Sequence, residues 1–350
     1  MDSGTYEIHI GPGLLEKVGQ RLTEIGTSGK LVIITNPVVK KLYGQSLQQS
    51  LARSGFQVTT LEVPDGEEYK SLDTASRLYH ELTNAYAERT TPILALGGGV
   101  IGDLTGFVAA TYQRGVPLVQ IPTTLLAQVD SSIGGKVAVN HGQLKNSIGA
   151  FYQPKAVITD IGTLKTLDAR ELNNGLAEVI KSAVIRDAEL FTFIEQNMDN
   201  IKSLDNDTLE EIVFRSARIK GEIVEKDERD LGLRSILNYG HTVGHAIETA
   251  SDFKTTHGEA VAIGMLVAGR IAHRLGVMEK GELDRLESVI TRAGLPTELP
   301  RLNTDTIIEA MKHDKKISQG KIRFILPRTI GEVFITDEVS PHLLKEVLAG

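Results

Sequence analysis

Short apolar segments alternate with amphipathic ones over the first half of the chain. Continuous apolar runs such as Leu31–Thr35 and Pro92–Leu96 are typical of strands that are buried on both faces. Ser71–Ala87 instead carries apolar residues at helical spacing, and Lys40–Ser54 also reads as a helix. Strands that alternate with helices predict a parallel sheet covered by helices on both faces. Further strands are expected at Tyr6–Ile10, Phe56–Val63, Val119–Pro122 and Val157–Asp160.

The pattern changes at about Thr166, and helical periodicity dominates from there on. Glu171–Ile185 has an apolar stripe at helical spacing, and Lys202–Ala250 continues helical. Further elements are expected as helices at Glu282–Ala293 and Thr304–Lys312 and as a short strand at Lys321–Pro327. We therefore predict an α/β protein with two domains: a Rossmann-like parallel-sheet domain of residues 1–165 and a mainly α-helical domain of residues 166–350.

A glycine-rich turn follows the strand at Pro92–Leu96. The segment Gly97–Gly102 fits G-x-G-x-x-G and precedes a predicted helix at Leu104–Thr111. Glycines at this place let backbone N–H groups approach a phosphate at a helix N-terminus. We interpret the segment as a phosphate-binding turn for a dinucleotide, although no acidic residue lies about twenty positions further on, as in the usual fingerprint. A tight turn without a ligand is the alternative.

Three histidines lie close together in the second half. His241 and His245 are four positions apart, so on a helix they share one face. His257 directly precedes Gly258-Glu259-Ala260-Val261, which reads as the start of another helix. Two helices thereby present imidazoles to one point, and Glu178 is the candidate third ligand of a metal ion. A zinc-protease helix is excluded because Thr242, not Glu, follows the first histidine.

The overall composition narrows the function classes. The 350-residue chain has 38 Lys and Arg against 45 Asp and Glu, so nothing in its charge favours nucleic acid or an anionic membrane. It contains no cysteine, so a metal must be held by histidine and carboxylate. We find neither a membrane-spanning apolar run nor a secretory signal, and we expect a cytoplasmic protein.

Several short motifs occur in one order along the chain. They are Pro64-Asp65-Gly66-Glu67, Gly97-Gly98-Gly99-x-x-Gly-Asp103, Arg114-Gly115, the block PTTLLAQVDSSIGGK from Pro122 to Lys136, Lys145-Asn146-x-x-Gly-Ala-Phe, Glu178-x-x-Lys181, Leu233-Arg234-x-x-Leu-Asn238-Tyr-Gly-His241-x-x-Gly-His245-Ala-Ile-Glu, His257-Gly-Glu-Ala-Val and Asp314-Lys315-Lys316. As an ordered set they closely resemble the 3-dehydroquinate synthase family.

The resemblance implies a two-domain enzyme that binds NAD on its N-terminal domain and one zinc, or cobalt, on its C-terminal domain. It implies a homodimer, with 3-deoxy-D-arabino-heptulosonate 7-phosphate bound in the cleft between the domains and converted to 3-dehydroquinate and phosphate in the shikimate pathway. It assigns the metal to Glu178, His241 and His257.

The resemblance also assigns cofactor and substrate contacts. NAD would meet Asp65, Gly66, Glu67, Glu68, Tyr69, Lys70, Gly99, Val100, Ile101, Gly102, Asp103, Thr123, Thr124, Lys136, Lys145, Thr163, Leu164, Lys165 and Thr166. Substrate would meet Asp130, Lys136, Asn146, Lys181, Lys220, Arg234, Asn238, His245 and Lys316, and Lys315 is the alternative to Lys316. Asn36 stands where relatives sometimes have Asp, and we leave it outside the cofactor set.

Two related activities remain as alternatives. Another sugar phosphate cyclase would use the same cofactors on a different sugar phosphate, and the Lys145-Asn146 block argues against it. A metal-dependent polyol dehydrogenase would not need so many cations around its substrate. A non-catalytic NAD-binding relative is disfavoured because every metal ligand and pocket cation is present.

Overall fold

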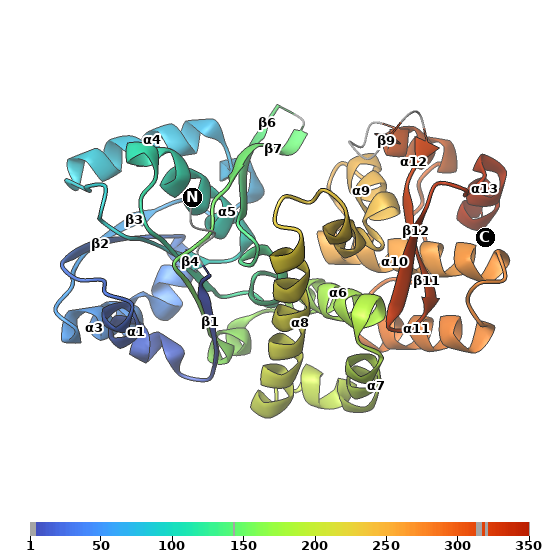
Figure 1. The fold of residues 1–350 in the computed structure, drawn as a ribbon, viewed down its shortest axis with the longest axis horizontal. Coiled ribbons are helices and arrows are strands. Elements are labelled where there is room, and N and C mark those ends of the chain that lie inside the picture. The colour runs from blue at the N-terminus through green and yellow to red at the C-terminus, as the bar shows by residue number, and fades with distance from the viewer. Residues whose placement is uncertain (1–4, 143, 313–316, 319–320, 350) are drawn as a thin grey trace. The chain divides into compact units, whose positions relative to one another are not determined.

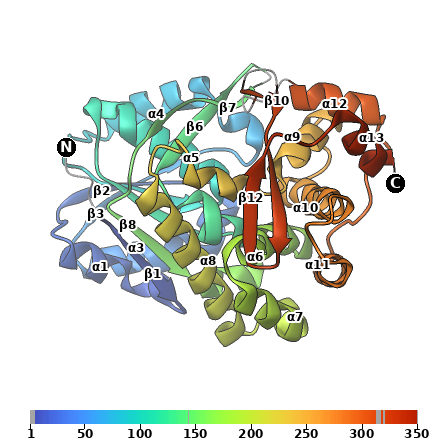
Figure 2. The same cartoon turned by 45° about the vertical axis from the view of Figure 1, so that its right-hand side comes forward.

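The computed structural model describes residues 5–142, 144–312, 317–318 and 321–349 (Figures 1 and 2). The chain divides into two compact units, Met1–Leu167 and Asp168–Gly350. The first unit contains a parallel sheet with helices, and the second is mainly helical. Among the described residues, no helix has the length and hydropathy needed to cross a membrane.

The first unit is built on a six-stranded sheet in which every pairing is parallel, as the alternating pattern predicts. The strand order is β1-β8-β5-β4-β2-β3. The strands are β1 (Glu7–Gly11), β2 (Lys30–Thr35), β3 (Gln57–Glu62), β4 (Ile93–Gly97), β5 (Leu118–Pro122) and β8 (Ala156–Asp160). Parallel strands direct all their carboxyl ends to one edge, where ligands of α/β proteins bind.

Helices cover both faces of this sheet because alternate strand residues point to opposite sides. Val32 and Ile34 pack in one cluster with side chains of α4 (Leu72–Asn84) and α5 (Gly99–Thr111). Leu31 and Ile33 belong to a second cluster with α1 (Val18–Glu24) and α3 (Gln45–Arg53). Figure 1 shows the two helix layers on either side of the strands. The short helical segments of this unit are η1 (Leu14–Lys17), α2 (Pro37–Val39), η2 (Lys40–Gly44), η3 (Glu67–Tyr69), η4 (Tyr112–Arg114), η5 (Ala127–Ser131) and η6 (Ile161–Thr166).

An antiparallel hairpin of β6 (Lys136–His141) and β7 (Leu144–Phe151) was not foreseen from the sequence. The sequence Leu-Lys-Asn-Ser-Ile-Gly-Ala-Phe of β7 has no clear alternation of apolar and polar residues, so it gives little strand signal. The hairpin contains Lys136, Lys145 and Asn146, which therefore lie on paired strands.

The second unit contains α6 to α13 together with η7. Their bounds are α6 (Ala169–Arg186), α7 (Ala188–Lys202), α8 (Asn206–Lys226), η7 (Leu233–Asn238), α9 (His241–Ala250), α10 (His257–Arg274), α11 (Lys280–Arg292), α12 (Thr304–Lys312) and α13 (Pro341–Ala349). The strands are β9 (Ile317–Ser318), β10 (Lys321–Ile322), β11 (Phe324–Thr329) and β12 (Glu332–Thr336), paired as two hairpins.

The prediction of continuous helix over Lys202–Ala250 is wrong. The helix ends at Lys202, and the Asp205 side chain caps the next helix by accepting the N–H of Thr208 at 3.0 Å. That helix ends at Lys226. There the Asp227 carboxylate accepts the N–H groups of Leu231, Gly232 and Arg234 at 2.8–3.0 Å and closes a loop. Side chains that hydrogen-bond to the nearby backbone offer it an alternative to the hydrogen bonds of a helix. The spacing of apolar residues does not reveal such bonds.

Asp160 ends β8 and holds the start of η1. Its carboxylate, 5% exposed, accepts the N–H groups of Gly13 at 3.0 Å, Leu15 at 2.9 Å and Gly162 at 2.8 Å. These donors come from segments about 145 residues apart in the chain. A buried carboxylate that satisfies three backbone donors is costly to remove, because each donor then lacks a partner.

We predict that Asp160→Ala lowers the free energy of unfolding by about 3 kcal/mol, since the N–H groups of Gly13, Leu15 and Gly162 lose their acceptor and the N–H of Leu15 is buried. Urea unfolding followed by circular dichroism measures it. Asp73→Ala is the control, because Asp73 is exposed in the first turn of α4, and its loss should cost less than about 1 kcal/mol. Equal effects of the two substitutions would contradict the role given to Asp160.

Candidate functional site

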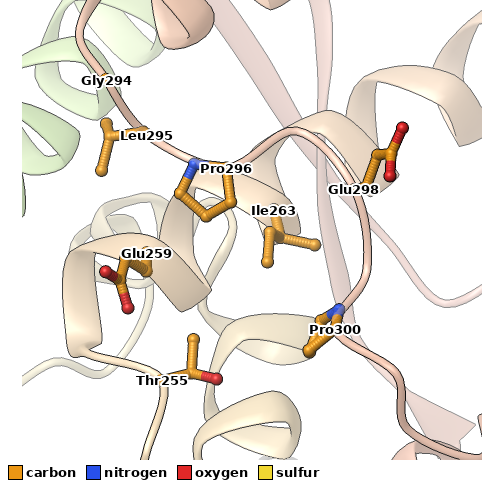
Figure 3. A pocket seen from close by; sticks show the side chains of 8 residues that line it. All are labelled: Thr255, Glu259, Ile263, Gly294, Leu295, Pro296, Glu298 and Pro300. Atoms are coloured by element: carbon orange, nitrogen blue, oxygen red, sulfur yellow. The ribbon is translucent and has the colours of Figure 1, made fainter.

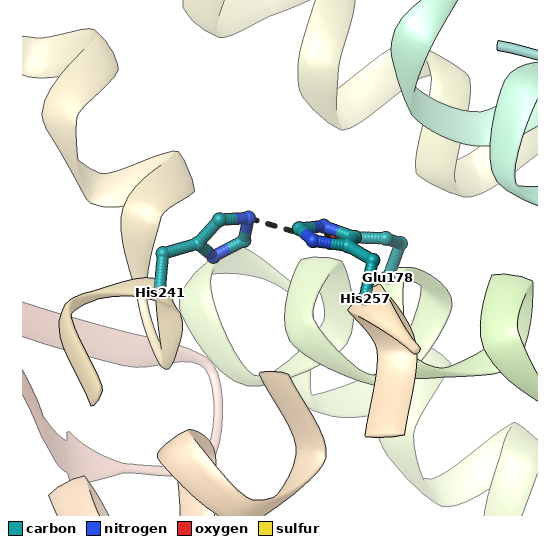
Figure 4. Close-up of side chains that lie close together, drawn as sticks. All are labelled: Glu178, His241 and His257. Atoms are coloured by element: carbon teal, nitrogen blue, oxygen red, sulfur yellow. Dashed lines mark hydrogen bonds and ion pairs between the residues drawn. The ribbon is translucent and has the colours of Figure 1, made fainter. Parts of the chain in front are cut away.

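Three potential metal ligands converge in the second unit. Glu178 lies in the middle of α6, while His241 and His257 are the first residues of α9 and α10. Glu178 Oε1 lies 3.1 Å from His257 Nε2 and 3.5 Å from His241 Nε2 (Figure 4). All three residues offer ligand atoms within 4.8 Å of one another. Both histidines therefore begin helices and face one carboxylate. The helix of His257 starts one residue earlier than the predicted start at Gly258.

The close approach of α9 and α10 depends on glycine. A Cβ at Gly264 of α10 would lie 1.9 Å from the carbonyl oxygen of Gly240, which directly precedes His241. No side chain fits there without moving one of the helices. Tyr239, fully buried, adds a hydrogen bond from its hydroxyl to the Met265 carbonyl at 3.0 Å. The backbone before His241 is thereby fixed to α10.

The first turn of α10 is also fixed to α6. The side chain of Asn174 accepts the N–H of Gly258, and Asn174 precedes Glu178 by one turn of the same helix. Glu259 accepts the N–H of Thr256 at 2.9 Å, and Arg170 of α6 donates two hydrogen bonds, each 2.9 Å long, to Glu259. One face of α6 thus holds both the carboxylate and the helix end that carries His257.

The charges at this point are balanced by partners. Glu178 is 1% exposed, and its second oxygen pairs with Lys181. Burial by itself raises the pKa of Glu178, but the Lys181 ammonium and the His257 ring outweigh it and lower that pKa to about 2. Burial lowers the pKa of His257, but hydrogen bonds to Glu178 and Glu248 outweigh it and raise that pKa to about 10.

The donor set suits zinc or cobalt. Ligands bound about 2.0–2.2 Å from a tetrahedral ion lie roughly 3.4 Å apart, which the two contacts of Glu178 Oε1 already approach. Two imidazoles and one carboxylate are a common protein set for catalytic zinc, which keeps a fourth position open. A histidine that binds a metal ion must be neutral. A divalent ion would therefore replace the proton on the Nε2 atom of His257, which faces Glu178.

His245 and the predicted cations of the second unit lie on neighbouring elements. The His245 ring centroid is 5.2 Å from that of His241 and 6.1 Å from that of His257. Lys181, Lys220 and Arg234 are 2%, 8% and 2% exposed.

Arg234 belongs to η7, which ends at Asn238, and it donates to the Glu228 carbonyl at 2.6 Å. Backbone N–H groups, first that of Arg234, lower the pKa of Asp227, so this loop is closed by an ionised carboxylate. Lys316 and Lys315 lie outside the described residues.

In the first unit, the predicted cofactor residues gather after the carboxyl ends of the strands. Asp65 and Gly66 follow β3, and Glu67–Tyr69 form η3. Gly99–Asp103 form the start of α5, Thr123 and Thr124 follow β5, and Thr163–Thr166 belong to η6 after β8. The N–H of Thr123 bonds the Gly97 carbonyl at 3.0 Å, which joins two of these segments. The glycine turn stands between a strand and a helix, as predicted, and α5 begins earlier than expected, at Gly99.

Lys70 joins a predicted cofactor residue to a predicted substrate residue. Its ammonium, on a side chain 6% exposed, contacts both the Asp103 carboxylate in α5 and the Asn146 side-chain oxygen in β7. Asn146 has a φ of 52°, and its N–H is accepted by Asn140 at 2.9 Å. Asn140 also donates to Glu67 at 2.8 Å. The remaining predicted residues of this unit are Asp130 in η5, Lys136 at the start of β6 and Lys145 in β7.

Sequence reasoning missed three amides that hold these residues. Asn36 donates to Asp65 at 2.7 Å, Asn140 holds Asn146, and Asn174 holds the first turn of α10. Only Asn174 had a usable signal, since it stands four residues before Glu178. The other two partnerships join segments that are distant in sequence or belong to the unforeseen hairpin.

A surface pocket of about 460 Å³ lies between the start of α10 and the segment that follows α11 (Figure 3). Its lining residues are Thr255, Glu259, Ile263, Gly294, Leu295, Pro296, Glu298 and Pro300. They include two carboxylates, and no basic side chain is among these described residues. The pocket is therefore poorly suited to a phosphate, and it contains none of the predicted site residues.

The chain matches two family models that together cover residues 60–317. Residues 60–174 match 3-dehydroquinate synthase N-terminal, and residues 175–317 match 3-dehydroquinate synthase C-terminal. A 3-dehydroquinate synthase from Dehalococcoides mccartyi (strain CBDB1) is 52% identical over 334 residues, which are 95% of this chain and 93% of the relative.

Two solved structures have the same fold. A 2-epi-5-epi-valiolone synthase from Streptomyces hygroscopicus subsp. jinggangensis 5008, with NAD+ and Zn2+ bound, superposes with a TM-score of 0.92 at 30% identity, over 100% of this chain and 97% of that one. A 2-deoxy-scyllo-inosose synthase complexed with carbaglucose-6-phosphate, NAD+ and Co2+ gives 0.89 at 28% identity, over 97% and 95%. From both family models and the identity to its relative, the chain belongs to the 3-dehydroquinate synthase family.

Proposed function

We propose that the protein converts 3-deoxy-D-arabino-heptulosonate 7-phosphate to 3-dehydroquinate and phosphate, with NAD and one divalent metal, zinc or cobalt, as cofactors. The observation that carries this proposal is the convergence of Glu178, His241 and His257, which come from three separate family motifs. The 52% identical relative carries the name of this activity, and both structural neighbours hold NAD+ with Zn2+ or Co2+.

Residues 1–165 are proposed as the NAD-binding domain and residues 166–350 as the metal- and substrate-binding domain. When bound, the metal supplies Lewis acidity toward neighbouring substrate hydroxyls, and NAD supplies a reversible hydride acceptor, so oxidation, loss of phosphate, reduction and aldol closure occur without net redox change. The NAD contacts proposed are the residues after the strand ends named above, with Lys136 and Lys145 of the hairpin.

The protein's own side chains bind the substrate and move its protons. Lys136, Arg234 and neighbouring cations are suited to neutralising the phosphate, which would let the phosphate act as its own base. Lys181 pairs with Glu178 and orients that carboxylate. His245 stands one turn after His241 and is proposed to orient a substrate hydroxyl or to relay a proton. Asp130, Asn146, Asn238 and Lys316 complete the proposed substrate contacts.

A sugar phosphate cyclase with another substrate is the nearest alternative, because the two structural neighbours carry the names of such enzymes. The relative at 52% identity favours 3-dehydroquinate synthase over those at 30% and 28%. The several buried cations of the second unit disfavour a polyol dehydrogenase, whose substrate is uncharged. We also propose a cytoplasmic homodimer that binds neither nucleic acid nor membrane, and sedimentation velocity tests the dimer.

Purified protein with NAD and zinc is expected to release one phosphate for each 3-dehydroquinate formed, because the hydride returns to the substrate within each cycle. Phosphate, 3-dehydroquinate absorbance and NADH absorbance are followed together. No NADH should accumulate. Absence of phosphate release from a metal-loaded sample would favour another cyclase, whereas steady NADH growth on a polyol would favour a dehydrogenase.

Glu178→Ala and His257→Ala are each expected to lower zinc affinity and turnover by at least about 100-fold, because each removes one of three protein ligands. Bound zinc per chain after gel filtration and initial rates measure the two effects. His342→Ala is the matched control, since His342 is 84% exposed in the same unit. A ligand variant that keeps both zinc and activity refutes the assignment.

A further inference from the structure

The two histidines of the proposed metal site share one pattern of partners. The Nδ1 of His241 lies 3.1 Å from the carbonyl oxygen of Tyr239, and its Nε2 faces Glu178. A carbonyl oxygen only accepts, so this Nδ1 carries a proton, and in the neutral ring the lone pair is then on Nε2, which faces the site. The Nδ1 of His257 lies 3.2 Å from Glu248 Oε2, and its Nε2 also faces Glu178.

Glu248 is well fixed for this contact. It lies in α9, two turns after His241, and is only 6% exposed. A buried carboxylate needs a donor, and the His257 N–H supplies one. Asn174 separately holds the backbone after His257. The orientation of the His257 ring must therefore be fixed by a side-chain partner. Glu248 is the side chain found at Nδ1.

We propose that Glu248 is a positioning residue for the metal: by accepting the Nδ1–H of His257, it makes Nε2 the donor atom and thereby sets the affinity of the site. Imidazole has two neutral tautomers, and only the one protonated at Nδ1 offers its lone pair beside Glu178. The carboxylate also raises the basicity of the ring, which strengthens the bond to a cation. This inference rests on the proposed metal site.

The other geometric option makes Glu248 itself a ligand. His245, Glu248 and His257 also offer ligand atoms within 4.8 Å of one another. Such a site would use the Nδ1 of His257 and exclude Glu178, which already has two imidazole nitrogens at 3.1 and 3.5 Å. The set with Glu178 also has both Nδ1 atoms occupied by oxygen acceptors. We therefore propose that the ion binds Glu178, and that Glu248 contacts His257 without binding the ion.

The test measures zinc dissociation constants for the full-length protein by competition with a chromogenic chelator. Glu248→Leu, which removes the acceptor at similar volume, is expected to weaken zinc binding by about 10- to 100-fold. Glu248→Gln retains an oxygen acceptor and should recover most of that loss. Glu225→Gln, at an exposed position of α8, is the control and should bind zinc as the wild type does. Unfolding curves in excess chelator show whether each variant is folded without metal.

A second measurement distinguishes positioning from ligation. The visible absorption of the cobalt-loaded protein reports the atoms bound to the ion. It should keep its band positions in Glu248→Gln and change in Glu178→Gln. Zinc affinity of Glu248→Leu within twofold of the wild type overturns the proposal, as does a cobalt spectrum that changes with Glu248 but not with Glu178. A wild-type protein that binds no zinc overturns the metal site itself, and that failure is visible before any variant is made.

Discussion

Burial of the Glu178 carboxylate is the constraint on which the second unit depends. A charged group that is 1% exposed needs partners, because transfer of an unpaired carboxylate out of water is very costly. Lys181 of the same helix and the first residues of α9 and α10 supply them. Small residues at the contact, above all Gly264, let the two helices come close enough to do so. The proposed ligands therefore stand on packed helices, which hold geometry better than loops do.

Hydrogen bonds around the histidines serve the same end. Tyr239, Glu248 and Asn174 act on the imidazoles or on the backbone beside them, and each is buried. Tyr239 and Glu248 accept at the Nδ1 atoms of the two rings, and Asn174 holds the backbone beside His257. Such contacts would reduce the reorganisation that accompanies binding of an ion at the proposed site. In the first unit, the parallel sheet brings the carboxyl ends of several strands to one edge, and so places the residues that follow them close together. Lys70 then joins α5 to the hairpin through Asp103 and Asn146.

Much of this could be predicted because it is local. Buried parallel strands are short apolar runs, helices have their own period, and the glycine turn is visible between them. The fold class and the start of a helix beside His257 followed from such signals and are confirmed. The two breaks after Lys202 and Lys226 were missed because Asp205 and Asp227 bond the backbone through their side chains. The β6–β7 hairpin was missed because its second strand lacks alternation.

The sequence by itself determined the chemistry that is available: no thiol ligand, histidines and a glutamate in recognisable motifs, and a glycine turn after a strand. Only the tertiary structure decided which of these groups meet. Glu178 and His257 are 79 residues apart, and Glu248 faces the far side of the same ring from another helix. Such partnerships depend on how helices pack at close range, and packing is a property of surfaces in three dimensions. No pattern along one segment records it.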